Sequence, residues 1–277
     1  MASVGLDIGT GFVKCVSENA RVRFPSLYAY RRPSPWEERR GLVEAVGDDA
    51  LGMAENPNAV LVRPVVQGSP VNERGFAELV RHAIGKVLQE KGAVGRQHEG
   101  LHVVAGLPYG ARSQRDSVRR MVAKLCSPET CHVVPQAIGT LVDADLEDAV
   151  IVSIGQGTTE IVAFQGRIPV SVVSSHHAAG EISSKVGSSK TAYVDCQTFQ
   201  GAKAKPLVGM LADSICDELS SARQGLGGLP VVISGGGILI PGMREAIESR
   251  ISCKAIIPKD PVMSNALGLY RLASEAC

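Results

Sequence analysis

Three short turns in the sequence carry residue types that bind phosphate groups. Asp7-Ile8-Gly9-Thr10-Gly11 ends an apolar strand at 4–7, Gly155-Gln156-Gly157-Thr158-Thr159 follows another at 149–154, and Gly235-Gly236-Gly237 follows a third at 231–234. Glycine has no Cβ, so the backbone N–H groups of such turns can converge on an oxyanion, and a threonine hydroxyl adds one more donor. One Gly-Thr turn alone is ordinary hairpin chemistry. Together, the three predict a site that holds a polyphosphate from two sides and leaves the triple glycine for a base or ribose.

The elements that must position these turns alternate between strands and helices, which predicts an α/β fold with much parallel sheet. Both Gly-Thr turns are hairpin tips, because strands resume at 12–16 and 161–164. The stretch 22–72 has short strands broken by proline, glycine and charge, and it predicts a small inserted lobe. Further strands are expected at 101–105, 131–134, 168–173 and 231–234, and helices at 72–89 with an Asn72 cap, 112–125, 136–144, 178–186, 206–223 and 264–276.

The composition excludes several classes of protein. The 277 residues are 44% hydrophobic and 21% charged, which is globular and not disordered. Because 29 Lys and Arg balance 28 Asp and Glu, no global positive field attracts nucleic acid, and direct nucleic-acid binding is not expected. The arginines of the 112–125 helix are interpreted as a solvated face. Seven cysteines without a Cys-x-x-Cys pattern support neither a disulfide framework nor a zinc site.

Membrane segments are not expected either. The longest uncharged apolar runs have the length of strands. Met1-Ala2-Ser3 leads directly into the first strand, so neither a secretion signal nor an amphipathic anchor is expected there. We therefore expect a cytoplasmic protein with no intrinsic membrane anchor.

The turns and their order resemble the actin and sugar-kinase (ribonuclease H-like) ATPase fold, and within it the bacterial actin-like filament proteins of the MreB, MamK and ParM kind. Leu6–Gly11 is similar to the first phosphate loop, Ile154–Glu160 to the second, and Val232–Gly237 to the adenosine motif. Pro135-Gln136-Ala137 resembles the start of the first connecting helix, and 265–269 resembles the second. Phe24-Pro25-Ser26, 46–50 and 62–68 are similar to the small lobe that flanks the cleft.

The resemblance implies a two-lobed ATPase with a nucleotide cleft between the lobes, which binds ATP or GTP with Mg²⁺. Asp7 would hold the metal through water and take part in catalysis, Gln136 would orient the attacking water, and Glu160 is a third catalytic candidate. Alternatively, Asp7 is a turn residue, Gln136 a helix start and Glu160 an exposed strand residue. The implied nucleotide-binding residues are Gly9, Thr10, Gly11, Lys14, Ser153, Gly155, Gln156, Gly157, Thr158, Gly235, Gly236, Gly237 and Ile240.

Two departures from the family pattern bear on function. The second phosphate loop normally starts with an aspartate that holds a magnesium-bound water, whereas this chain has Ser153. A hydroxyl brings no charge and accepts protons poorly, so nucleotide binding is expected with slow hydrolysis. Only about 70 residues separate the second phosphate loop from the adenosine motif, too few for two full subdomains. We therefore expect a first lobe at 1–139, completed by the helix at 264–277, and a second lobe at 140–263 whose outer subdomain is reduced or absent.

These expectations define the predicted function. The chain would polymerise into cytoskeletal filaments in an ATP-dependent way and position cargo such as a plasmid, an organelle or cell-wall machinery through an unknown adaptor. Trp36, alone among charges, is a candidate anchor at a subunit contact. The alternative is a non-polymerising adaptor or reactivating chaperone of the EutJ or pilus-assembly type. A sugar or acetate kinase is a third possibility, disfavoured because no candidate aspartate base stands in a substrate-binding insertion.

Overall fold

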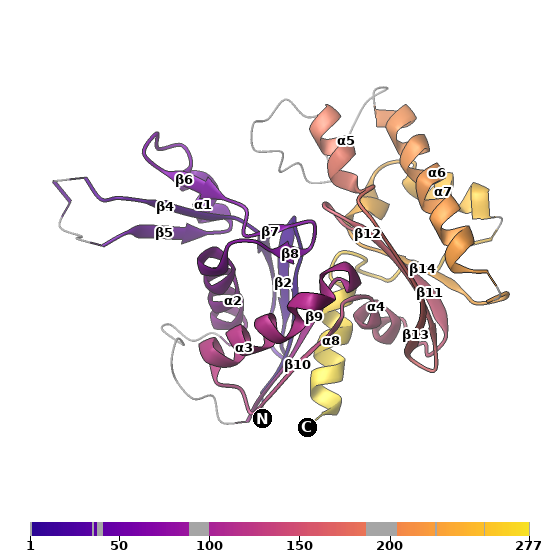
Figure 1. Cartoon of the computed structure of the whole chain (residues 1–277), viewed down its shortest axis with the longest axis horizontal. Coiled ribbons are helices and arrows are strands. Elements are labelled where there is room, and N and C mark those ends of the chain that lie inside the picture. Colours follow the sequence, from indigo (N-terminus) through magenta and orange to yellow (C-terminus); the bar gives the residue numbers. More distant parts are fainter. Residues whose placement is uncertain are drawn as a thin grey trace.

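The computed structural model describes residues 2–276 except 35, 38–40, 89–99, 187–203, 225 and 252. Two sheets, each covered by helices on both faces, form the two halves of the chain, and a small lobe projects from the first half (Figure 1). None of the described helices combines the length and the hydrophobicity that a bilayer span requires.

The first sheet has the order β10-β9-β1-β2-β3. Its strands are β1 (Ala2–Ile8), β2 (Phe12–Val16), β3 (Arg21–Pro25), β9 (Leu101–Leu107) and β10 (Thr130–Pro135). The first three form an antiparallel meander, and β9 and β10 run parallel to β1. All seven residues of β9 are buried, as expected for a central parallel strand that is covered on both faces. The predicted first hairpin is confirmed.

The second sheet repeats this order as β13-β12-β11-β14. The predicted second hairpin joins β11 (Ala149–Ile154) to β12 (Thr159–Gln165), β13 (Ile168–Ser175) continues the meander, and β14 (Val231–Ser234) runs parallel to β11. A parallel bridge between Val232 and Ile256 occupies the place of a fifth strand. The two Gly-Thr tips therefore occupy equivalent positions in two copies of one sheet topology.

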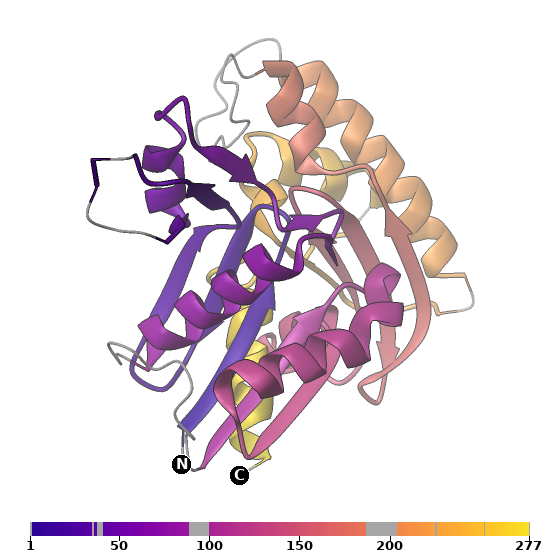
Figure 2. The same ribbon diagram turned by 60° about the vertical axis from the view of Figure 1, so that its left-hand side comes forward.

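Helices cover both faces of each sheet. In the first half, α2 (Glu73–Val87) and α3 (Arg115–Cys126) lie on one face and α8 (Ser264–Glu275) on the other (Figure 2). In the second half, α5 (Ala179–Val186), α6 (Ala204–Ala222) and α7 (Met243–Ile251) lie on one face and α4 (Ala137–Asp143) on the other. The Asn72 side chain accepts a hydrogen bond from Gly75 N at 2.7 Å, which confirms the predicted cap of α2.

The helix expected at 112–125 differs at its start. Residues Tyr109–Gln114 form the 3₁₀ helix η1, and α3 begins only at Arg115. Pro108 precedes η1 and its carbonyl accepts from Ala111 N at 2.9 Å, a tight i to i+3 turn. The turn at Pro108 therefore belongs to the end of β9 rather than to the helix.

The small lobe contains a three-stranded sheet of β5 (Val43–Val46), β4 (Tyr28–Arg31) and β6 (Val60–Val62), with the short helix α1 (Asp48–Met53) packed on it. The hairpin of β7 (Val65–Val66) and β8 (Ser69–Pro70) returns the chain toward the first sheet. Gln67 and Gly68 at its tip both have positive φ, at 49° and 74°. This tip reaches the first Gly-Thr turn.

Helices α4 and α8 cross between the two sheets. A Cβ on Gly268 of α8 would lie 1.8 Å from the carbonyl oxygen of Gly139, and a Cβ on Gly139 would lie 2.2 Å from that of Asn265. Only glycine at both positions lets the two backbones approach this closely. The crossing joins the two halves directly beneath the hairpin tips.

Candidate functional site

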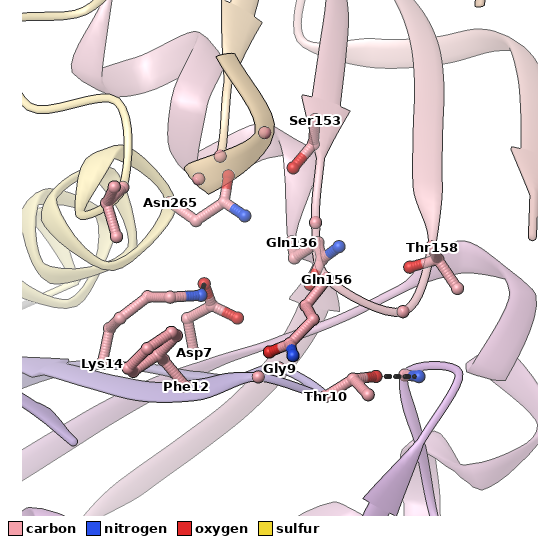
Figure 3. A pocket seen from close by; sticks show the side chains of 18 of the residues that line it. Asp7, Gly9, Thr10, Phe12, Lys14, Gln136, Ser153, Gln156, Thr158 and Asn265 are labelled. Carbon is pink, nitrogen blue, oxygen red and sulfur yellow. Dashed lines mark hydrogen bonds and ion pairs between the residues drawn. The ribbon is translucent and has the colours of Figure 1, made fainter. Parts of the chain in front are cut away.

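The two Gly-Thr tips face each other in close contact. A Cβ on Gly157 would lie 2.5 Å from Thr10 Oγ1, and one on Gly11 would lie 2.1 Å from Gln156 Oε1. Figure 3 shows Thr10 and Gln156 approaching from opposite tips. Gly157 therefore leaves room for the Thr10 side chain, and Gly11 leaves room for the Gln156 side chain. Thr10 Oγ1 also accepts a hydrogen bond from Gly68 N at 2.9 Å, which ties the first tip to the β7–β8 hairpin.

The tips and the triple glycine line one cavity, with a volume of about 80 Å³. Gly235, which has a φ of 89°, starts the turn that brings this glycine run against Ile154, where a Cβ on Gly237 would lie 2.2 Å from Ile154 Cγ2. The predicted residues that line the cavity are Asp7, Gly9, Thr10, Gly11, Lys14, Gln136, Ser153, Gly155, Gln156, Gly157, Thr158, Gly235, Gly236 and Gly237.

Asp7 and Lys14 form an ion pair on the floor of the cavity. They stand directly opposite each other on β1 and β2, and Lys14 Nζ lies 2.8 Å from Asp7 Oδ2. The other carboxylate oxygen, Oδ1, is buried and has no hydrogen-bond partner among the described residues. Such an orphaned acceptor in a polar cavity suits a hydrated divalent cation, which Mg²⁺ sites usually hold through one or two carboxylates and substrate phosphates. The residues present therefore fit a magnesium ion.

Glu160 lies deep behind the cavity and is fully buried, not on an exposed strand face. Its carboxylate accepts a hydrogen bond from Tyr109 N and a further one from the Gln136 side chain, while Oε2 has no hydrogen-bond partner in the part of the chain that the structure describes. Burial raises the pKa of Glu160 to about 7; these hydrogen bonds oppose the rise, and the nearby negative charge of Asp7 adds to it. A carboxyl group with a pKa near neutrality can exchange protons at physiological pH.

Ser153 and Glu160 are direct partners in the β11–β12 ladder. Directly opposed residues of an antiparallel pair place their side chains on the same face of the sheet, about 5 Å apart at Cβ. The only carboxylate of this hairpin tip therefore stands next to the position where the family pattern has aspartate. The strand register brings them together, although seven positions separate them in the sequence.

Ile240 does not line the cavity. It is buried in the apolar core of the second half, beside η3 (Gly236–Leu239) and α7. The neighbouring Leu239 faces the cavity instead. The sequence pattern predicts the position of the turn. The Ile240 side chain nevertheless lies in the core, because the 3₁₀ turn rotates the residues after the triple glycine.

Several cavity residues were not anticipated from the sequence. Arg23 of β3 lies over the Phe12 ring at 5.1 Å, and Asn265 of α8 accepts from Thr140 Oγ1 at 2.7 Å. Thr140 also bonds Ser234 Oγ at 3.0 Å, so one polar chain links α8, α4 and β14. The sequence signals were weak, since each is a single polar or aromatic residue in an ordinary strand or helix. The complete set of unanticipated lining residues is Phe12, Arg23, Gly68, Pro108, Leu239, Pro261, Val262 and Asn265.

Comparison with known proteins identifies the fold. No protein-family model matches the sequence, and no curated protein matches it significantly. Among solved structures, the chain is similar to MreB5 of Spiroplasma citri bound to AMPPNP (TM-score 0.78, 16% identity, covering 99% of this chain and 96% of that one). It is also similar to the same protein bound to ADP (TM-score 0.77, 16% identity, 99% and 97%) and to the MamK double helical filament (TM-score 0.81, 18% identity, 99% and 98%). The fold is that of the actin-like proteins, as the sequence motifs predict.

Proposed function

We propose that this protein binds ATP or GTP with Mg²⁺ and assembles into actin-like filaments. The observation that carries the proposal is the convergence of two Gly-Thr tips, a triple glycine and the Asp7–Lys14 pair on one cavity of an actin-like fold. The neighbours of this fold include a protein solved with AMPPNP and ADP and one solved as a double helical filament.

The roles of the residues follow from their positions. The N–H groups of the two tips and the Lys14 ammonium would hold the β- and γ-phosphates, and the triple glycine would face the ribose or base. Asp7 would hold the hydrated Mg²⁺, which neutralises phosphate charge when bound. Gln136 would orient the attacking water. Glu160 would supply, from across the ladder, the carboxylate that Ser153 lacks, so we expect slow nucleoside-triphosphate hydrolysis.

The domain organisation that we propose has a first lobe at 1–139, with the C-terminal helix returning to it, and a second lobe at 140–263. The outer subdomain of the second lobe would be reduced or absent. Residues 187–203, where such a subdomain would be inserted between α5 and α6, lie outside the described residues. The filament would act in the cytoplasm and position cargo through an adaptor protein.

A non-polymerising adaptor on the same fold is the second candidate. The serine at position 153 favours it, because the missing carboxylate would slow a nucleotide cycle. The two candidates differ in assembly and not in nucleotide binding.

Sedimentation distinguishes the two candidates. The full chain at tens of micromolar would be centrifuged with Mg²⁺ and ATP, GTP or AMPPNP, and the pellets viewed by electron microscopy. We expect nucleotide-dependent pelleting of filaments. The matched control is Lys14→Ala, which removes a phosphate-binding charge and should stay in the supernatant. Monomers under every nucleotide condition, with nucleotide binding intact, would establish the adaptor instead.

A further inference from the structure

A second, apolar groove lies behind the nucleotide cavity, at the ends of β9 and β10. It has a volume of about 260 Å³ and is lined by Leu107, Pro108, Tyr109, Val133, Val134 and Pro135, with Arg112 and Arg115 at its rim. Almost all of its lining is aliphatic or aromatic. A volume of this size holds one large apolar side chain, and an exposed apolar hollow with a polar rim is typical of a binding surface.

The rim of this groove is positively charged. Arg112 lies over the Tyr109 ring at 4.9 Å, and neither Arg112 nor Arg115 forms an ion pair with a described residue. Arg119 follows one helical turn after Arg115 and lies 3.9 Å from Asp116, a weak pair. The guanidinium groups of Arg112 and Arg115 are therefore exposed cations that a partner carboxylate can reach, beside a hollow that an apolar side chain can fill.

We propose that this groove binds a short acidic segment of a partner protein, in which a large apolar side chain is flanked by carboxylates. The apolar lining accommodates the side chain, and the Arg112–Arg115 rim complements the carboxylates. A nucleic-acid backbone would pair with the arginines but leave the hollow empty. A flat membrane surface would not enter it.

The groove contacts the nucleotide site through one turn of the chain. Pro108 lines both cavities, and the N–H of Tyr109 donates to Glu160, whose carboxylate also accepts from Gln136. A segment seated against Pro108 and Tyr109 would restrict the turn that holds Glu160. Occupancy would therefore change nucleotide affinity, and by linkage nucleotide would change segment affinity by the same factor. This coupling, unlike the binding itself, rests on the proposed function.

The test uses fluorescein-labelled pentapeptides and the full chain, with binding followed by fluorescence anisotropy. The probes are Asp-Glu-Phe-Glu-Asp, its serine counterpart Asp-Glu-Ser-Glu-Asp, and Lys-Lys-Phe-Lys-Lys. We expect the acidic phenylalanine peptide to bind roughly tenfold more tightly than either of the others. The variant Arg112→Glu with Arg115→Glu should lose about tenfold in affinity, whereas the matched pair Arg120→Glu with Lys124→Glu, exposed on the same helix but outside the groove, should lose less than about twofold.

Each alternative outcome is decisive. The proposed site would be overturned by an equal loss of peptide affinity in both charge-reversed pairs or by equal binding of the phenylalanine and serine peptides. The absence of peptide binding below about 1 mM would overturn it as well. Binding of duplex DNA or of vesicles containing phosphatidylserine that is lost with Arg112→Glu and Arg115→Glu, without peptide binding, would assign the rim to those ligands. Melting curves of all variants exclude unfolding as a cause.

If nucleotide does not bind at all, the proposed function fails, while the peptide measurements still test binding to the groove. If both bind without affecting each other, only the coupling is wrong.

Discussion

Glu160 gives the protein a pH-dependent stability of its own. Its pKa of about 7 in the fold, against 4.5 as an ordinary value, means that the folded state holds a proton which the unfolded state has released at intermediate pH. The contribution of this proton to the free energy of unfolding is complete below pH 4.5 and is lost as the pH rises through about 7, by roughly 3 kcal/mol in total. We expect Glu160→Gln to remove this dependence and to raise the melting temperature at pH 8. Exposed Glu55→Gln is the control, and identical pH profiles for Glu160→Gln and wild type would contradict the assignment.

The Ser153–Glu160 pair yields a prediction about hydrolysis. Restoring aspartate by Ser153→Asp places two carboxylates opposite each other on the ladder, which is destabilising. The double variant Ser153→Asp with Glu160→Gln avoids the repulsion while keeping one charge. We expect the single variant to melt lower than the double, and Glu160→Gln alone to reduce phosphate release by about 10²-fold or more. Phosphate release that Glu160→Gln leaves unchanged would show that Glu160 has no part in the reaction.

The position of Asp7 yields a prediction about where magnesium would bind. Asp7→Asn keeps a side-chain oxygen for Lys14 but removes the charge and the second acceptor oxygen, which no described residue contacts with a hydrogen bond. We expect ATP to raise the melting temperature of both proteins by mass action, and added Mg²⁺ to increase that shift only in the wild type. The measurement is a thermal melt with ATP in EDTA and in Mg²⁺. An equal magnesium increment in the variant would place the metal elsewhere.

At the scale of elements, the crossing of α4 and α8 depends on glycine. Gly268→Ala would force a Cβ against the backbone of Gly139, where no flexible side chain can move aside. We expect a loss of at least about 3 kcal/mol in the free energy of unfolding, or separation of the helices. Gly209→Ala on α6 is the matched control, because nothing lies within 4 Å of the new Cβ. It should gain about 0.5–1 kcal/mol from helix propensity. Denaturant unfolding measures both, and a small cost for Gly268→Ala would mean that the crossing is loosely packed.

At the scale of the whole molecule, the close contact between the tips bears on how the proposed nucleotide would enter. Gly157 packs directly against Thr10 across the cavity, so we expect the tips to separate when a nucleoside triphosphate enters. We expect the observed rate of binding of a fluorescent ATP analogue to level off at high nucleotide concentration, as for a required conformational step. Gln156→Ala removes the side chain that rests on Gly11 and should raise the limiting rate. A rate that rises linearly with concentration in both proteins would show an open cleft.

The sequence by itself determined the local elements and the turns. Hydrophobic periodicity and turn residues are local properties of the sequence. A glycine after an apolar strand forms a hairpin tip, and Asn72 before residues of helical periodicity forms a helix cap. The two hairpins, the triple glycine and the order of strands and helices could therefore be predicted directly, and the resemblance of these turns to known motifs predicted the actin-like fold.

Tertiary structure alone decided which side chains meet. Glu160 is adjacent to Ser153 because of the ladder register, and within the fold its carboxylate accepts a hydrogen bond from Tyr109 N of η1. Arg23 and Asn265 reach the cavity from a third strand and from the last helix, and Ile240 turns into the core because a 3₁₀ turn follows the glycines. Contacts between residues far apart in the chain depend on packing and register, which no single segment encodes. For that reason the glycine turns and Glu160 itself were visible in the sequence, while the burial of Glu160 and the apolar groove behind it were not.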